Sequence, residues 1–183
     1  PRELISDERT TANAHIPIVM KEIDMQEMAR KAIDEDNIDV LRAVINTIKD
    51  PNYTLDNRET ALNYACTKRR YRIIYYLLYI GADINKKDQK RNTPLHAAVK
   101  SNDLVAVNIM LQRNADVNTR DVLNNTPLHT AIEKGYINIA YVLIEAGANL
   151  NLVNSKKDTP LDTAKKYQRK EIENLLLRKM GKL

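Results

Sequence analysis

The sequence is poor in several residue types, and each shortage excludes a class of structure or function. It has no tryptophan or phenylalanine, a single cysteine and only 4 glycines in 183 residues. The lone Cys66 cannot form an internal disulfide, which suits a reducing compartment, and we expect it to be a packed structural thiol. So few glycines leave no glycine-rich loop for binding phosphate. No apolar run approaches the roughly 20 residues that span a bilayer, and we see no charged-then-apolar leader. We therefore expect an intracellular protein, in the cytoplasm or nucleus, that is not embedded in a membrane.

What the sequence does contain is a repeat with a period of 33 residues. The period is set by four leucines, Leu62, Leu95, Leu128 and Leu161. The stretch NTPLHAA at 92–98 recurs as NTPLHTA at 125–131 and as DTPLDTA at 158–164. Its threonine suits the N-cap of a helix, and its proline suits the first helical position, where a missing N–H costs nothing. A second apolar period follows, as at 104–111, and then breaks at a turn. A fixed period of this length predicts stacked helix-turn-helix units.

The units also end alike, with GADIN at 81–85 and GANLN at 147–151. Together with the TPLH motif, these endings resemble those of the ankyrin repeat family, over roughly residues 25–183. The resemblance implies an all-α fold, an ankyrin-repeat solenoid of about five helix-turn-helix units joined by β-hairpin loops. The richness in Ile, Asn, Lys and Tyr suggests an A+T-rich genome, as in ankyrin proteins of viral or intracellular-bacterial type. We expect an N-terminal arm at 1–23 and an ankyrin repeat domain at 24–183, with repeats at about 24–54, 55–87, 88–120, 121–153 and 154–183.

Both ends of the repeat region depart from the pattern. The run Ile16–Met20 contains a proline, which argues against a helix, so we expect an extended arm that either covers the apolar edge of the first repeat or binds a partner. Asp24, with Glu27 three residues later, resembles a capping box and predicts that the first helix begins there. The last unit is highly charged, with an apolar stripe from Ile172 to Leu176, as a terminal repeat needs on the face that meets water.

The sequence offers little for catalysis. His96 and His129 lie one repeat apart, too far to share a metal ion whose bonds to nitrogen are about 2.1 Å long. The ankyrin resemblance implies that their ring nitrogens tie the turns of adjacent repeats together. Asn63 and Asp162 replace the histidine in the neighbouring units, so we expect this network to be incomplete at both ends. We expect no enzyme activity, no cofactor and no metal site.

Surface charge favours protein binding. In the ankyrin family, partners usually meet the hairpin tips and the exposed face of the first helices. At these positions the chain has more basic than acidic residues, and its formal net charge is +5. We therefore expect a partner protein with an acidic surface. The candidate partner-binding residues are Lys87, Lys90, Lys100, Arg120, Val122, Leu123, Asn125, Lys134, Lys156 and Tyr167.

Val122 and Leu123 are the candidate anchor, because the other hairpin tips are polar at these positions. The alternative is that they fold back onto the neighbouring hairpin. The basic surface has two other interpretations, an ordinary solvated face and a site for nucleic acid. The second is disfavoured because the charges are spread widely and stacking rings are nearly absent from the tips. We expect a monomer that acts as a host-targeting effector or inhibitor, or else an interaction module from a larger adaptor or enzyme.

The turn before each first helix lacks the glycine that the family normally has there. The residues in its place are Arg58, Arg91, Asn124 and Lys157. Only asparagine among these tolerates a left-handed backbone well, so we expect the hairpin tips to differ slightly in shape.

Two further groups of side chains are candidate sites. The first is a set of outward-facing tyrosines on second helices, which are either half-buried packing or a patch for a partner. Its members are Tyr75, Tyr79 and Tyr141. The second is a set of hairpin asparagines at the position that asparaginyl hydroxylases modify in the family, although hydrogen bonding within the same turn is a simpler role. Its members are Asn85, Asn118 and Asn151.

Overall fold

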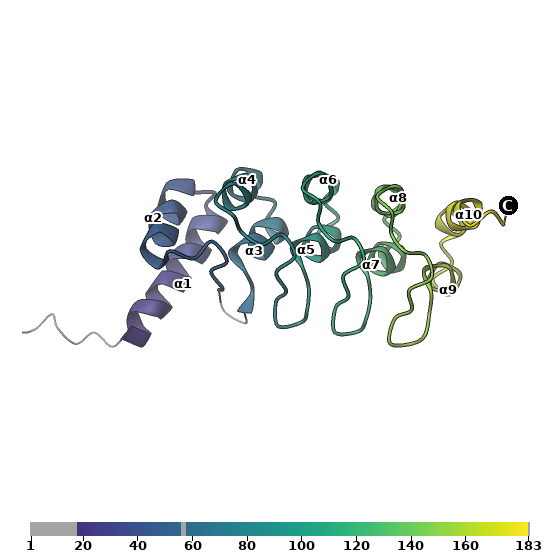
Figure 1. Ribbon diagram of the computed structural model, residues 1–183, viewed down its shortest axis with the longest axis horizontal. Coiled ribbons are helices and arrows are strands. Elements are labelled where there is room, and N and C mark those ends of the chain that lie inside the picture. The colour runs from purple at the N-terminus through teal and green to yellow at the C-terminus, as the bar shows by residue number, and fades with distance from the viewer. Residues whose placement is uncertain (1–17, 56–57, 183) are drawn as a thin grey trace, which may run out of the picture.

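A computed structural model describes residues 18–55 and 58–182, with side chains from residue 24 onward. The helices are α1 (Ile18–Asp34), α2 (Ile38–Ile48), α3 (Ala61–Thr67), α4 (Tyr71–Tyr79), α5 (Pro94–Lys100), α6 (Leu104–Gln112), α7 (Pro127–Lys134), α8 (Ile137–Glu145), α9 (Pro160–Lys166) and α10 (Lys170–Lys179). Figure 1 shows successive helix pairs side by side, with the second helices in one row and long loops extending away from that row. In the described residues, β-pairing is limited to one isolated bridge between Thr54 and Thr60. The predicted all-α repeat solenoid is therefore confirmed.

The first helix of each later pair begins as the TPLH motif predicts. In α5, the Thr93 side chain accepts a hydrogen bond from the His96 backbone N–H, and the His96 side chain accepts one from the Thr93 backbone N–H. Pro94 stands at the start of the helix, where no N–H is required. The same reciprocal cap is present at α7 and α9. The motif thus fixes where each loop ends and each helix starts.

The repeated apolar positions form one continuous core. Leu62, Leu95 and Leu128 are all buried, each at the same place in its unit. Cys66 is fully buried at the position that Val99 and Ile132 fill in the next units. Burial, with a smaller contribution from nearby Asp103, raises the pKa of the Cys66 thiol, so it stays protonated as a packing group.

The prediction that the first helix begins at Asp24 is wrong, because α1 begins at Ile18. A proline disfavours helix at the residue before it, but it does not prevent a helix from starting after it, as α1 does after Pro17. Asp24 is instead an exposed residue within the helix. The expected extended arm lies outside the described residues up to position 17.

Two arginines join neighbouring helix pairs at the turn opposite the loops. The Arg70 guanidinium, at the N-cap of α4, donates to the carbonyl oxygens of Ile33 (3.0 Å) and Asp34 (2.5 Å) at the end of α1. Arg169, 99 residues later at the N-cap of α10, donates in the same way to the last carbonyls of α7. A cation suits these helix C-termini, whose carbonyls have no partner within the helix. The second helix pair is thus joined to the first, and the last pair is joined to the one before it.

The described residues contain no helix whose length and apolar character would let it cross a membrane.

Candidate partner-binding surface

The loops between helix pairs are shaped by their own acidic and amide side chains. The Asp121 carboxylate accepts hydrogen bonds from the backbone N–H groups of Leu123 (2.8 Å) and Asn125 (3.0 Å). Asp88 accepts from the Asn92 N–H, and Asn154 accepts from the Lys156 N–H in the next loop. Such side-chain caps replace the backbone ladder that a true hairpin would have. They also commit these carboxylates to the inside of the loop.

The expectation that the hairpin tips differ in shape is wrong for the three tips that the structure describes in full. The four residues that replace glycine all adopt the left-handed region, with nearly equal φ angles of 57°, 59°, 55° and 63°. In three of the turns the backbone N–H of this residue donates to the carbonyl of the capping residue, as from Arg91 to Asp88 at 3.0 Å. These caps hold the turn against a conformational cost of roughly 1–2 kcal/mol for a residue with a Cβ.

Backbone hydrogen bonds also join the tips of neighbouring loops. The Val122 N–H donates to the Lys90 carbonyl at 3.0 Å, and the Ser155 N–H donates to the Leu123 carbonyl at 2.8 Å. The Val122 and Leu123 side chains are nevertheless 52% and 57% exposed. Their backbone is therefore held from both sides while more than half of each residue stays exposed, and Leu123 also lines a hollow with Ser155 and Lys156 of the next loop.

The hairpin asparagines connect repeats rather than closing their own turns. The Asn85 side-chain oxygen accepts from the Asp116 N–H at 2.9 Å, and that of Asn118 accepts from the Asn149 N–H at 2.8 Å. Asn52 makes the same bond to Asp83 at 2.6 Å, a role that the sequence did not reveal because the first unit lacks the GADIN ending. The expected bond within the turn runs the other way, with the asparagine N–H donating to the preceding Asp or Asn side chain.

Hydroxylation of these asparagines stays a proposal. Asn151 is exposed, whereas Asn85 and Asn118 are half-buried and engaged with the next loop.

The histidines connect repeats as the family resemblance implies. The His96 ring nitrogen Nε2 lies 3.2 Å from the Asn125 carbonyl oxygen, and His129 Nε2 lies 3.1 Å from the Asp158 carbonyl oxygen. Burial lowers the pKa of His96 to about 4 and also lowers that of His129. The rings are thus neutral structural groups. Among the described residues, no three His, Cys, Asp or Glu side chains are grouped to hold a metal ion.

The expectation that this network is incomplete at both ends is wrong at the N-terminal end. Asn63 Nδ2 donates to the Asn92 carbonyl at 3.1 Å, which reproduces the bond from His96 to the following loop. A carboxamide can replace imidazole here because both offer an N–H at similar reach. At the other end, Asp162 turns back to Thr159 of its own cap.

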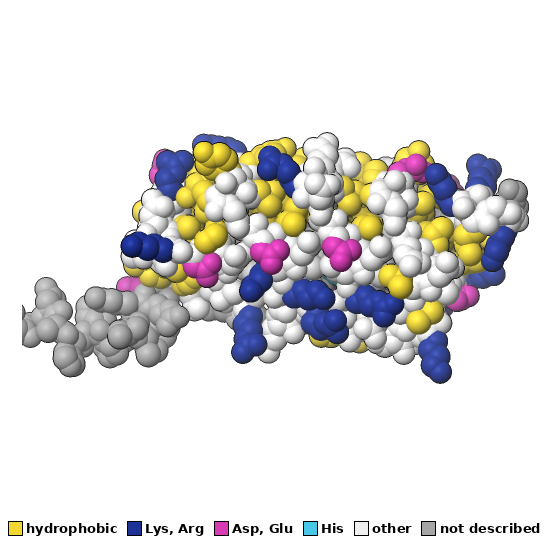
Figure 2. Space-filling view, in the orientation of Figure 1, with side chains coloured by type: hydrophobic (Ala, Val, Ile, Leu, Met, Phe, Trp, Pro, Cys, Tyr) yellow, Lys and Arg dark blue, Asp and Glu magenta, His cyan; other side chains and the backbone are white. Residues whose placement is uncertain are grey.

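The predicted basic residues are exposed at the loops and on the first helices. Lys87, Lys90, Lys134 and Lys156 are exposed and Arg120 is half-buried, and none of these five forms an ion pair within the described part of the chain. Lys100 donates to the Asn92 side-chain oxygen at 2.5 Å. On the face seen in Figure 2, basic side chains gather over the loops, below a row of separate acidic side chains. In the described part of the loops, these basic side chains are therefore accessible to a partner.

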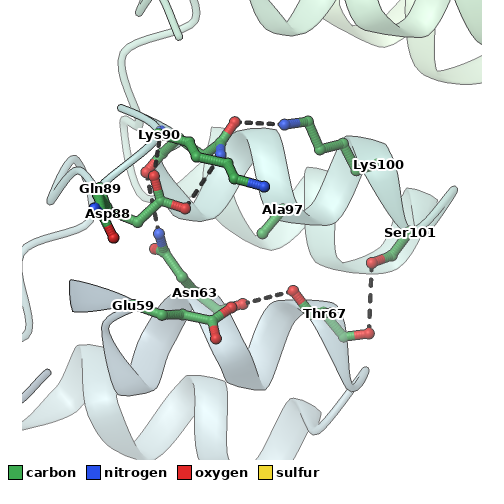
Figure 3. A pocket seen from close by; sticks show the side chains of 10 residues that line it. Glu59, Asn63, Thr67, Asp88, Gln89, Lys90, Ala97, Lys100 and Ser101 are labelled. Carbon is green, nitrogen blue, oxygen red and sulfur yellow. Dashed lines mark hydrogen bonds between the residues drawn. The ribbon is translucent and has the colours of Figure 1, made fainter. Parts of the chain in front are cut away.

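Two hollows lie between the loops and the first helices. The larger encloses about 840 Å³ between α3, α5 and the loop at Lys90, and Figure 3 shows the side chains of both helices facing it. It includes Lys90 and Lys100 of the predicted residues, together with Glu59, whose carboxyl has its pKa raised by burial. The smaller, of about 100 Å³, is lined by four other predicted residues, Leu123, Asn125, Lys156 and Tyr167.

Four predicted residues, Lys87, Arg120, Val122 and Lys134, line neither hollow. Sequence reasoning missed Asn63 and Ala97 as lining residues of the larger hollow. The larger hollow is wide because small side chains such as Ala97 and Ser101 line it. In the smaller hollow, Tyr167 stands at the position that is equivalent to Ser101, two repeats later. A comparison of these repeat positions by side-chain size could have located the larger hollow.

Comparison with known proteins assigns the family. A family model for ankyrin repeats in three copies matches residues 27–121 and 95–182.

An ankyrin repeat protein of fowlpox virus is 46% identical over 46 residues, which is 25% of this chain and 10% of the viral protein. The mouse RelA-associated inhibitor is 33% identical over 66 residues, 36% of this chain and 8% of that protein. An ankyrin repeat protein of a mimivirus is 30% identical over 98 residues, 49% of this chain and 13% of that protein. The chain thus spans only about a tenth of the length of these curated relatives. With the family model covering most of its length, this chain belongs to the ankyrin repeat family.

Proposed function

We propose that this chain is a non-catalytic binding module that holds an acidic partner protein along its loop edge. Ankyrin repeats are protein-interaction modules, so the proposal concerns which surface binds and what chemistry it selects. By loop edge we mean the tips that carry Lys87, Lys90, Arg120 and Lys156, with Val122 and Leu123 between them.

The observation that carries the proposal is the unequal pairing of charges in the loops. Asp88 and Asp121 are occupied by backbone N–H groups of their own turns, whereas the neighbouring cations form no ion pair in the described residues. Asp121 is buried and Asp88 is half-buried, whereas the lysines are exposed, so basic side chains are the more accessible to a partner at the loops. Accessible basic side chains steer and select acidic partners.

The apolar pair supplies the binding energy that charges alone do not. Val122 and Leu123 are more than half exposed, and polar or basic residues surround them, Lys90, Arg120 and Asn125 among them. An apolar centre with a polar rim is how protein interfaces concentrate affinity. Because the backbone of the tip is already tied to both neighbouring loops, little ordering entropy is lost when a partner covers it.

The charge part of the proposal is tested by affinity capture with the immobilised full chain from a nuclease-treated host lysate. The comparison is with a variant in which Lys87, Lys90, Arg120 and Lys156 are all changed to Ser. We expect acidic proteins to bind the parent chain at ~50 mM salt, to elute by ~300 mM salt, and to be missing from the variant, since screening weakens exposed charges. Capture that survives in the variant contradicts the role of the cations. Capture seen only from a parallel lysate without nuclease treatment would favour the nucleic-acid alternative.

The finer role we propose is that of an intracellular, monomeric host-targeting effector or inhibitor. Matches to proteins of two viruses support the first part, and the match to a protein named as a RelA-associated inhibitor supports the second. Each match covers half of this chain or less. The alternative is a module from a larger adaptor or enzyme, and the identity of the captured partner distinguishes the two roles.

A further inference from the structure

The row of second helices carries an aromatic and cationic patch that the loop-edge proposal does not use. Tyr79 on α4 is 87% exposed, Tyr75 is 47% exposed, and Val105 on α6 is 53% exposed. Arg72 and Arg113 are exposed beside them. We call these five residues the outer patch.

Packing does not account for the outer patch. Tyr71, one turn before Tyr75 on the same helix, is half-buried and donates its hydroxyl hydrogen to Asp103, at 3.0 Å from both carboxylate oxygens. Tyr71 thereby joins two helix pairs, as a structural tyrosine does. Tyr79 has no such contact within the described residues and exposes nearly all of its ring.

The patch spans two neighbouring helices as one surface. Tyr75 and Tyr79 stand one turn apart on α4, and the Arg113 guanidinium, just after α6, lies 6.0 Å from the centre of the Tyr75 ring. That cation–π contact orients the guanidinium before any partner arrives. Arg72 and Val105 occupy equivalent positions 33 residues apart in successive units, so each lies near the start of its own second helix.

The charges of the patch are uncompensated, whereas those beside it are paired. Neither α4 nor α6 contains an Asp or Glu, and Arg72 and Arg113 form no ion pair in the described residues. On one flank Arg42 pairs with Asp39 on α2, at 3.4 Å. On the other flank Lys179 pairs with Glu145 on α8, at 2.5 Å. In the outer patch, the unpaired guanidinium groups of Arg72 and Arg113 therefore stand beside exposed aromatic side chains.

We propose that the outer patch is a second protein-binding surface, which takes a partner segment with an apolar side chain flanked by carboxylates. Tyrosine and arginine are the residue types that dominate binding energy at interfaces, and the free guanidinium groups select carboxylates. The apolar side chain would rest on the exposed rings of Tyr75 and Tyr79 while the carboxylates reach Arg72 and Arg113. This surface lies on the second helices, away from the loop edge, so two partners could be held at once (Figure 1).

The test is to pan a phage library of random dodecapeptides against the full chain and sort the clones by their binding to variants. The patch variants are Tyr79→Ala and Arg72→Ser, whose exposed side chains should leave the melting temperature nearly unchanged. Tyr141→Ala is the matched control, because Tyr141 is a 50% exposed tyrosine on α8, beside the paired Glu145. The double variant Val122→Ser with Leu123→Asp reports on the loop edge separately.

We expect a set of clones rich in Asp and Glu around an apolar residue. Their binding should fall at least tenfold on both patch variants and stay unchanged on Tyr141→Ala and on the loop-edge variant. The inference is overturned if no clone depends on Tyr79 and Arg72, or if the dependent clones are not enriched in acidic residues. Neither result would bear on the loop edge, whose failure would show only in the double variant.

Discussion

At the scale of single residues, the bond between successive repeats is made by two kinds of side chain. His96 and His129 use an imidazole, while Asn63 uses a carboxamide to reach the same carbonyl of the next loop. The exchange is incomplete, because Asn63 Oδ1 is buried without a hydrogen-bond partner. In His96 the corresponding atom, Nδ1, accepts from the backbone N–H of Thr93 at 3.2 Å. A buried acceptor left unpaired lowers stability by roughly 1–3 kcal/mol.

This comparison predicts that Asn63→His stabilises the protein. The imidazole would keep the bond to the Asn92 carbonyl through Nε2, and its Nδ1 would accept the Thr60 N–H, as in the next unit. We expect a gain of about 1 kcal/mol in the free energy of unfolding by urea. The matched variant His96→Asn should lose a similar amount. A loss of stability in both variants would mean that each site is specific for its own side chain.

The buried histidines also predict a fall in stability in acid. Protonation of His96 at Nδ1 would turn the acceptor of the Thr93 N–H into a donor, and burial lowers the pKa of this histidine to about 4, against about 6.5 in an unfolded chain. Between these two values the unfolded chain binds a proton that the folded chain does not. The contribution of the neutral His96 ring to the free energy of unfolding is therefore complete above pH 6.5 and is lost as the pH falls towards 4.

The lowered pKa of His96 corresponds to about 3 kcal/mol, and His129 adds to it in the same direction. Urea unfolding at a series of pH values from 7.5 to 4 measures the loss. The part of the pH dependence of the unfolding free energy that is due to His96 should disappear in His96→Asn. Stability that is flat across this range in the parent chain would show that these rings take up protons without breaking their bonds.

At the scale of elements, the repeat period could be read with more certainty than the ends of the stack. The TPLH motif located the starts of α5, α7 and α9 because a cap and a proline act within four residues of each other. The sequence does not locate the start of α1, because no Thr-Pro pair precedes Ile18 and the capping pattern at Asp24 lies within the helix. The sequence thus predicts a helix start where a cap and a proline next to it determine that start.

Contacts between elements were largely beyond sequence reasoning. The bonds from Arg70 to the end of α1 span more than 30 residues, and nothing at Arg70 itself marks it as a clamp rather than an exposed cation. The shared left-handed turns were missed for a related reason, since the capping carboxylates that hold them act through geometry. Of the candidate site, exposure and charge were predictable from the period, but the hollow beside Lys90 depended on several small side chains meeting.

At the scale of the whole molecule, the stack separates the loops from the second helices. Each helix pair packs mainly on its neighbours, as α5 does on α3 and α7, so the apolar core runs through the middle and both outer surfaces repeat along it. Figure 1 shows the loops and the row from α4 to α10 on different sides. Substitutions on either surface leave the core untouched, and binding can therefore be changed without unfolding the protein.

The central claim, that the loop edge binds the partner through Val122 and Leu123, is tested most directly by a binding titration. The captured acidic partner, once purified, is titrated into the parent chain and into the variant Val122→Ser with Leu123→Asp, and the melting temperature of each is measured alongside. Because both side chains are more than half exposed, the melting temperature should stay nearly unchanged. The Kd should rise at least tenfold, a loss of about 1.4 kcal/mol. An unchanged Kd together with a lower melting temperature would show that the two side chains pack on the loops, and it would contradict the claim.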